Sequence, residues 1–217
     1  MKFLFSSIGQ KIQVALSGIL LALFLFFHLL NNLTLFYGST TFNNMVMFLE
    51  SIKPFIRVME FGLLIVILLH IINALRLTVL NKKSKGQPYK YNSQSDVSSL
   101  NSRTMAISGS IILFFLIMHL SYIWYTYQII TDHQYYDILL QNQFGFIGHF
   151  PTAIFYIIAI ICISFHLKHG MHSALKTLGI RKQDKLGLLY YGTIFFWGFI
   201  PFGFIIIIIA IQLGVIS

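Results

Sequence analysis

Five apolar runs, each long enough to cross a lipid bilayer as a helix, constrain this chain more than any other feature. A membrane-spanning helix needs roughly 20 apolar residues. The runs cover approximately residues 12–36, 56–80, 104–130, 151–178 and 188–214. Because water does not reach the hydrocarbon core, backbone groups there must pair within their own helix or in a closed barrel. The runs therefore predict an all-α integral membrane protein, with residues 1–217 forming one domain of five transmembrane helices.

The overall composition agrees with this fold class. Of the 217 residues, 57% are hydrophobic and 10% charged, and the mean hydropathy is +0.78. A soluble domain of this length could not bury so much apolar surface. The single cysteine, Cys162, lies inside an apolar run, so the chain has no partner for an intramolecular disulfide. The first run is too long for the core of a cleavable signal peptide, and we expect none.

The basic residues predict how the chain is oriented in the membrane. Lysine and arginine accumulate in cytoplasmic loops. Only Lys53 and Arg57 fall on one side of the predicted membrane, and thirteen fall on the other. These are Lys2, Lys11, Arg76, Lys82, Lys83, Lys85, Lys90, Arg103, Lys168, Lys176, Arg181, Lys182 and Lys185. We expect a multi-pass protein of the bacterial cytoplasmic (inner) membrane with a cytoplasmic N-terminus and an outer C-terminus. This distribution explains the net charge of +9 through topology, without a nucleic-acid partner.

One polar loop and one repeated pattern stand out. The polar segment 81–103 is either a solvated linker or a docking surface for a cytoplasmic partner. Ser17-Gly18 precedes His28 in the first run, and Ser108-Gly109 precedes His119 in the third. The serine-to-histidine spacing is eleven residues in both, and the second copy follows the first by 91 positions. The matched spacing favours an internal duplication over coincidence.

Histidines occur in each of the first four runs. Ionisable residues inside a membrane are rare and functional by default. A structural hydrogen bond between helices could explain any single one, but explains four successive helices poorly. We expect His133 and His149, in the outer connector 131–150, to be solvated loop residues. The others are His28, His70, His119, His166, His169 and His172.

The depths of these histidines predict two pairs. A helix rises about 1.5 Å per residue. His28 lies seventeen residues after Lys11 and His119 sixteen after Arg103, which places both roughly 25 Å from the cytoplasmic edge. His70, twelve residues before Lys82, and His166, ten before Lys176, lie roughly 15–18 Å from it. His28 should therefore face His119 in the outer half of the membrane, and His70 should face His166 nearer the cytoplasm.

Two facing imidazoles at one depth are the ligand set for haem b. Haem iron takes axial nitrogen ligands, and a four-helix bundle core is a usual place for them. A zinc ion would need three or four clustered protein ligands. The run of His166, His169 and His172 could suggest a zinc or di-iron site, but the further histidine or carboxylate boxes are missing. The sequence predicts a four-helix bundle with two haems and a peripheral fifth helix, with His28 and His119 on the outer haem iron and His70 and His166 on the inner one.

Small residues on the same helix faces fit this interpretation. Eleven residues are close to three helical turns, so Ser17 shares a face with His28 about 16 Å away, near the depth of the inner pair. Ser17-Gly18 and Ser108-Gly109 could admit the flat macrocycle and bond a propionate. The alternative is ordinary small-residue packing between membrane helices. On the fourth run, Gly170 could relieve contact with a ring, and His169 could serve a propionate.

Motifs along nearly the whole chain carry a family resemblance. They are Ser17-Gly18 to His28-Leu29-Leu30-Asn31-Asn32-Leu33; Phe42-Asn43 with Phe48-Leu49-Glu50-Ser51; Arg57-Val58-Met59-Glu60 to His70; Asn81-Lys82; Ser102-Arg103 to His119; and Phe165-His166-Leu167-Lys168-His169-Gly170 through Ser173 to Thr177-Leu178-Gly179. With these residues the chain resembles the single-chain, five-helix, di-haem cytochrome b subunit of succinate dehydrogenase and fumarate reductase.

The resemblance implies a function and partners. A flavoprotein subunit and an iron–sulfur subunit would bind the cytoplasmic face, and electrons would pass between them and a membrane quinone, often menaquinone, through two haems b. The dicarboxylate chemistry would lie outside this chain. Glu50 matches an acidic position near quinone in this family, where it could exchange protons with a quinone oxygen; it could also be a loop charge beside Lys53. For Glu60, the sequence suggests a helix cap or a pair with Arg57.

Two other functions stay open on the sequence alone. A stand-alone di-haem transmembrane electron-transfer cytochrome would bind its own donor and need no cytoplasmic subunits. A transporter with a histidine-lined path is the other, although acidic residues and broken helices are scarce in the spans.

Overall fold

The structure is a computed structural model that describes residues 3–83, 105–130, 134–180 and 187–217. The described residues are helical, with turns and bends between the helices and no strand. Five helices are long and apolar enough to cross a membrane: Ser7–Tyr37, Lys53–Leu80, Met105–Ile129, Phe150–Thr177 and Leu188–Gln212. They agree with the five predicted runs. His133 lies outside the described residues, and so does the polar segment 81–103 from residue 84 onward.

Two of the spans have a recognisable start in the sequence. Helix α1 (Ser7–Leu33) is capped by Ser6, whose side chain accepts a hydrogen bond from the Gly9 N–H at 3.1 Å. Helix α9 (Phe150–Thr177) has proline in its first turn, where the missing N–H leaves no bond unmade. Helices α3 (Lys53–Lys83) and α6 (Met105–His119) complete the set that carries the membrane histidines.

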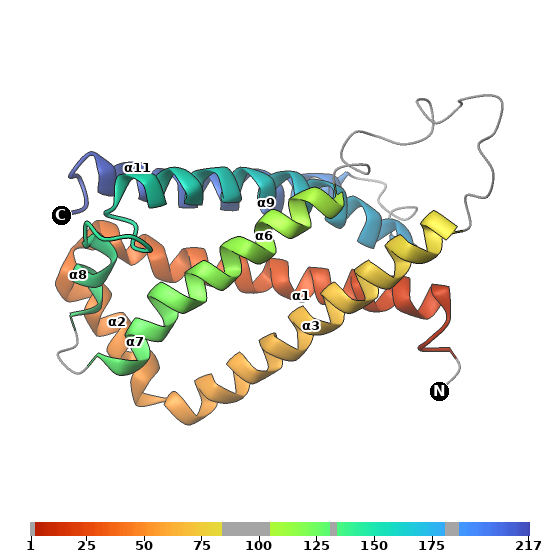
Figure 1. Cartoon of the computed structure of the whole chain (residues 1–217), viewed down its shortest axis with the longest axis horizontal. Helices are drawn as coiled ribbons and strands as arrows, with labels where there is room; N and C mark the ends of the chain where they lie inside the picture. The colour runs from red at the N-terminus through yellow and green to blue at the C-terminus, as the bar shows by residue number, and fades with distance from the viewer. Residues whose placement is uncertain (1–2, 84–104, 131–133, 181–186) are drawn as a thin grey trace.

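Contacts between the spans give the order of packing. Helix α1 packs against α3, α9 and the last helix, α11 (Ile200–Gln212), and α6 packs against α9. Figure 1 shows α1 and α9 running along the long axis of the molecule, with α3 and α6 crossing it obliquely. The large apolar side chains that point outward, such as Val58, Phe61 and Leu75, are more than half exposed. Such surfaces are stable in contact with hydrocarbon and not with water.

Two connectors that the sequence left unassigned form short helices at one end of the molecule. Helix α2 (Ser39–Ser51) lies within the connector 37–55, and α8 (Tyr135–Leu140) lies within 131–150. Gly38, with φ of 87°, makes the turn between the short 3-10 helix η1 (Thr34–Tyr37) and α2. Figure 1 shows α2, α8 and the C-terminus together, at the end away from the N-terminus.

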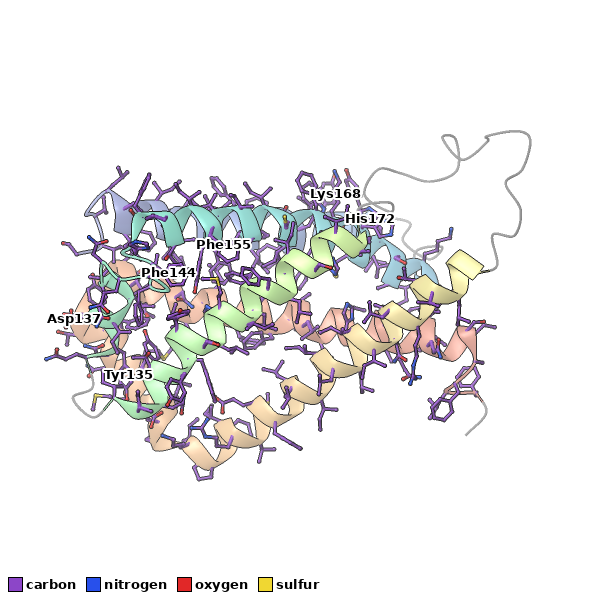
Figure 2. The ribbon with its side chains drawn as sticks, in the orientation of Figure 1. Tyr135, Asp137, Phe144, Phe155, Lys168 and His172 are labelled. Carbon is purple, nitrogen blue, oxygen red and sulfur yellow. The ribbon has the colours of Figure 1, made fainter. Side chains whose placement is uncertain are left out.

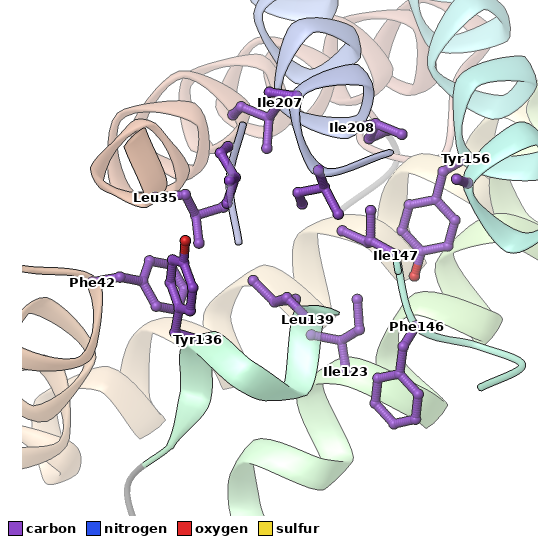
Figure 3. Close-up of a cluster of buried hydrophobic side chains, with 14 of the residues drawn as sticks. Leu35, Phe42, Ile123, Tyr136, Leu139, Phe146, Ile147, Tyr156, Ile207 and Ile208 are labelled. Carbon is purple, nitrogen blue, oxygen red and sulfur yellow. The ribbon is translucent and has the colours of Figure 1, made fainter. Parts of the chain in front are cut away.

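These connectors contribute to an apolar core in the described chain. Figure 3 shows Leu35, Phe42, Tyr136 and Leu139 meeting side chains from α11. Phe42 is 2% exposed and Tyr136 3%. The two short helices are also joined by a hydrogen bond, in which the Tyr136 N–H donates to Asn43 Oδ1 at 2.9 Å. We call α2 and α8, together with Leu35, Phe146 and Ile147, the outer cap, because the predicted topology places them outside.

Two spans contain a single wide turn. The π-helical segment η2 (Leu120–Trp124) follows His119 directly and leads into α7 (Tyr125–Ile129). The segment η4 (Phe195–Phe199) joins α10 (Leu188–Ile194) to α11. Such π-bulges in α-helices often occur at functional sites. A hydrophobic pattern of period 3.6 cannot reveal them, so the sequence predicted straight helices here.

Candidate functional site

Two pairs of histidines face each other between the helices. The rings of His28 on α1 and His119 on α6 have centroids 5.8 Å apart at 85°. The rings of His70 on α3 and His166 on α9 have centroids 6.3 Å apart at 60°. These are the two pairs that depth along the helices predicted. Each pair joins two helices that are far apart in sequence.

The spacing within each pair fits one metal between two imidazoles. Bonds from a metal to an imidazole nitrogen are about 2.0–2.1 Å, so two rings opposed across one ion have centroids roughly 6 Å apart. Both measured spacings are close to this value. Among the described residues, no group of three or more His, Cys, Asp or Glu side chains gathers to hold a metal ion by itself. Each pair by itself therefore offers two imidazole ligands to a metal ion.

The inner pair is held by two serines in matching positions. Ser17 Oγ lies 3.0 Å from His70 Nδ1, and Ser108 Oγ lies 3.3 Å from His166 Nδ1. Both serines are buried, with exposed fractions of 6% and 9%. The serine of the first helix in each repeat thus contacts the histidine of the second helix. The duplicated pattern in the sequence corresponds to a duplicated contact, once between α1 and α3 and once between α6 and α9.

The glycine after each serine lies under the same imidazole. A Cβ at Gly18 would lie 3.3 Å from His70 Cε1, and a Cβ at Gly109 would lie 3.7 Å from His166 Cε1. The small residues make room for the neighbouring histidine ring. We predicted that these serines and glycines would admit the macrocycle and bond a propionate. That role is still a prediction, and the contacts seen are with the histidines.

The outer pair has aromatic surroundings instead. His28 stacks on Phe24, at 5.4 Å and 16°, and has the Phe204 ring 5.5 Å away. His119 stacks on Phe115, at 5.7 Å and 26°, and its Nδ1 lies 3.4 Å from the Tyr156 hydroxyl. In the described chain no hydrogen bond reaches a ring nitrogen of His28. The outer pair is therefore packed by apolar rings, whereas the inner pair is held by hydroxyls.

The sequence did not single out Tyr156. It is one of eleven tyrosines, it lies in an apolar run, and its spacing matches none of the other motifs. Figure 3 places it at the edge of the apolar core, near Ile147 and Phe146 of the outer cap. Its ring also packs against Phe115, at 4.9 Å.

A polar seam between α1 and α3 was also not predicted. Asn73, which is 4% exposed, donates from Nδ2 to Gln13 Oε1 at 3.0 Å. Ser17 Oγ donates to the Gln13 carbonyl at 2.7 Å. The seam joins the inner histidine His70, through Ser17 and Gln13, to Asn73 on α3.

The other predicted residues of α9 lie farther along this helix. His169 is half-buried, and Gly170 has no heavy atom of the described chain within 4 Å of a Cβ placed on it. Nδ1 of His172 lies 2.7 Å from the Lys168 carbonyl. Figure 2 shows Lys168 and His172 near the start of α6, far from Asp137 and Tyr135 at the outer cap. The roles of His169 and Gly170 at a haem are still predictions.

Two acidic residues lie at the end of α2 and near the start of α3, between His28 and His119 in the sequence. Glu50 forms an ion pair with Lys53 at 2.7 Å, and Glu60 pairs with Arg57 at 2.5 Å, as one of our interpretations of Glu60 expected. Glu60 also accepts a hydrogen bond from Trp124 Nε1 at 2.9 Å, and Arg57 donates to Gln128. This cluster joins the start of α3 to the π-bulge after His119.

One histidine prediction is wrong in part. His149 is the N-cap residue of α9 and is half-buried, with Nδ1 2.9 Å from Thr152 Oγ1. Thr152 is 1% exposed and also accepts from the Gly145 N–H. The His149 side chain makes no capping hydrogen bond to the helix backbone, and the sequence signal for the start of this helix is Pro151 in its first turn.

No protein-family model, no curated protein and no solved structure matches this chain. The account of its function therefore depends on the residues and their geometry.

Proposed function

We propose that this chain is the di-haem b membrane-anchor subunit of a succinate:quinone oxidoreductase. The observation that carries the proposal is the presence of two facing histidine pairs on four helices, at two depths of the membrane. In the proposal α1, α3, α6 and α9 form the four-helix bundle and α11 is peripheral to it. His28 and His119 would ligate the outer haem iron, and His70 and His166 the inner one.

The donor set supports haem over a bare metal ion. Each pair offers two imidazoles at a spacing that one iron can bridge, and a porphyrin supplies the remaining four nitrogens. When bound, each haem would supply a carrier of one electron at a time. The four histidines of this chain would hold the iron, and Phe24, Phe115 and Phe204 pack beside the rings of the outer pair.

Two carriers at different depths imply electron passage across the membrane. The inner pair lies near the predicted cytoplasmic side, where an iron–sulfur subunit with its flavoprotein would dock. The outer pair lies near the outer cap, where a quinone would exchange electrons. Direction, either succinate oxidation or fumarate reduction, follows from the potentials of the partners.

For the quinone, our prediction is the outer end, with Glu50 as a proton-exchanging group. The carboxylate is 31% exposed and paired with Lys53. That pairing fits the alternative interpretation of a charge beside Lys53, and a proton-exchanging group would have to release this partner during turnover. Replacing Glu50 by Gln should therefore slow quinone turnover without loss of haem if the quinone assignment holds, and leave turnover unchanged if it does not.

The experiment that tests the proposal is isolation of the tagged chain from its native membranes in mild detergent. We expect a flavoprotein and an iron–sulfur protein to co-purify, and the complex to reduce a quinone analogue with electrons from succinate. A chain that carries haem but isolates alone would instead be the stand-alone di-haem cytochrome. A chain without haem would be neither kind of cytochrome, and this result would favour the transporter alternative.

A further inference from the structure

The two buried serines have a hydrogen-bonding geometry that selects one form of each inner histidine. Ser17 has one hydroxyl proton, and its nearest acceptor is the Gln13 carbonyl, 2.7 Å from Oγ. With that proton committed, Oγ accepts from the imidazole, whose Nδ1 lies 3.0 Å away. Ser108 repeats the arrangement, with the Met105 carbonyl 3.1 Å from Oγ and His166 Nδ1 at 3.3 Å.

We propose that Ser17 and Ser108 are positioning residues that hold His70 and His166 as Nδ1–H tautomers, leaving each Nε2 lone pair free for iron. In a neutral imidazole one nitrogen donates and the other accepts, and the bond made by the first decides which nitrogen can bind metal. This inference depends on the proposed function only where it concerns haem. The tautomer itself is a property of the chain alone.

The glycine after each serine is part of the same arrangement. Because Gly18 lacks a Cβ, the His70 ring can lie against α1 where Ser17 can reach it, with Cε1 only 3.3 Å from the position of that Cβ. The same holds, less tightly, for Gly109 and His166 at 3.7 Å. The Ser-Gly pair is therefore one unit, in which the serine receives the proton and the glycine makes space for the ring.

The outer pair has no serine on either ring. Within the described chain, His119 Nδ1 lies 3.4 Å from the Tyr156 hydroxyl, and no hydrogen bond reaches the His28 ring. A ligand imidazole that donates from Nδ1 to an acceptor is a stronger electron donor to its metal. Stronger donation favours the oxidised iron, so loss of the serine should raise the midpoint potential of the inner haem and leave the outer haem unchanged.

The experiment compares Ser17→Ala and Ser108→Ala with Ser110→Ala in the full chain. Ser110 is the matched control, because its hydroxyl donates to the Ala106 carbonyl of the same helix and is exposed. Redox titration followed by visible spectra should show one of two components shifted to higher potential in Ser17→Ala and Ser108→Ala, more in the double variant, and none in Ser110→Ala. Affinity for the inner haem should fall about tenfold or more. Ser17→Thr, which keeps the hydroxyl, should restore both.

A second measurement does not need haem. In chain labelled with ¹⁵N-histidine and stripped of haem, nitrogen chemical shifts should report Nδ1–H for His70 and His166, and Ser17→Ala should release His70 into a mixture of tautomers. Absence of haem from the native chain would defeat the proposed function and leave this result standing. Two haems with unchanged potentials in both serine variants, or Nε2–H tautomers in the stripped chain, would overturn the inference.

Discussion

At the scale of single residues, the pairing of the four histidines is the feature with most consequence. If each pair holds one haem iron, as we propose, that iron needs both rings, so removing one ring or both should cost the same haem. His28→Ala and the double variant His28→Ala with His119→Ala should each leave one haem per chain. His28→Ala combined with His70→Ala should leave none. Pyridine haemochromogen assays normalised to protein check this.

His133→Ala is the control for that series and should keep both haems. If combining His28→Ala with His119→Ala removes both haems while each single variant keeps one, the rings do not share an iron and the pairing is wrong.

The residue scale also shows what the sequence could predict about the site. Helix depth, counted from the basic residues at the predicted cytoplasmic edge, was sufficient to pair all four histidines. It could not predict that the serine hydroxyls meet Nδ1 of the histidines on the next helix, because that contact depends on how the helices rotate against each other. Tyr156 was not predicted for the same reason, since an apolar run does not show which of its residues face α6.

At the scale of elements, a proline in the last helix explains one of the two wide turns. Pro201 has no N–H, so the carbonyl four residues earlier, at Trp197, loses its helical partner. Water cannot replace that partner inside a membrane. Ser164 of α9 donates its hydroxyl to the Trp197 carbonyl instead, and the π segment Phe195–Phe199 lies at this point. The bulge thus joins α9 to the last span.

Ser164→Ala should leave this carbonyl unpaired and cost about 1–3 kcal/mol of stability. Thermal unfolding of the purified chain in detergent should show a lower Tm. Adding Pro201→Ala restores a backbone N–H, so the double variant should recover most of the loss. Equal destabilisation of Ser164→Ala with and without Pro201→Ala would show that the hydroxyl does not replace the missing helical bond.

The connectors contain helices that the sequence did not predict. Helix α2 carries buried Phe42 and Val46 one turn apart, a spacing that indicates a helix with one buried face. It lies between two far more apolar spans, and its partner is the short helix α8, distant in sequence. The sequence pattern could indicate the helix, but it could not indicate the surface against which the helix packs.

At the scale of the whole molecule, the membrane orientation can be tested with the native cysteine removed. In Cys162→Ala chain, Asn142→Cys lies in the exposed loop after α8, and Ser93→Cys lies in the polar segment 81–103. A membrane-impermeant maleimide applied to intact cells should label position 142 and not 93, because the excess of positive charge predicts that the second segment is cytoplasmic. Inverted vesicles should give the opposite pattern. Labelling of position 93 in intact cells would reverse the topology.

At this scale the five spans were predictable because length and hydropathy alone decide whether a segment can cross a bilayer. The outer cap was not, since it is held by contacts among four separate stretches of the chain, among them Asn43 with Tyr136 and Gln212 with the Ile147 carbonyl. The fold of each span is local in sequence, whereas the arrangement that brings His28 to His119 is not.

The central claim is that the two histidine pairs each hold a haem. A reduced-minus-oxidised spectrum of the purified chain, with haem quantified against protein, tests it most directly. We predict two haems b per chain, both low-spin with two histidine ligands. A chain expressed with sufficient haem that shows no haem absorption would contradict the claim.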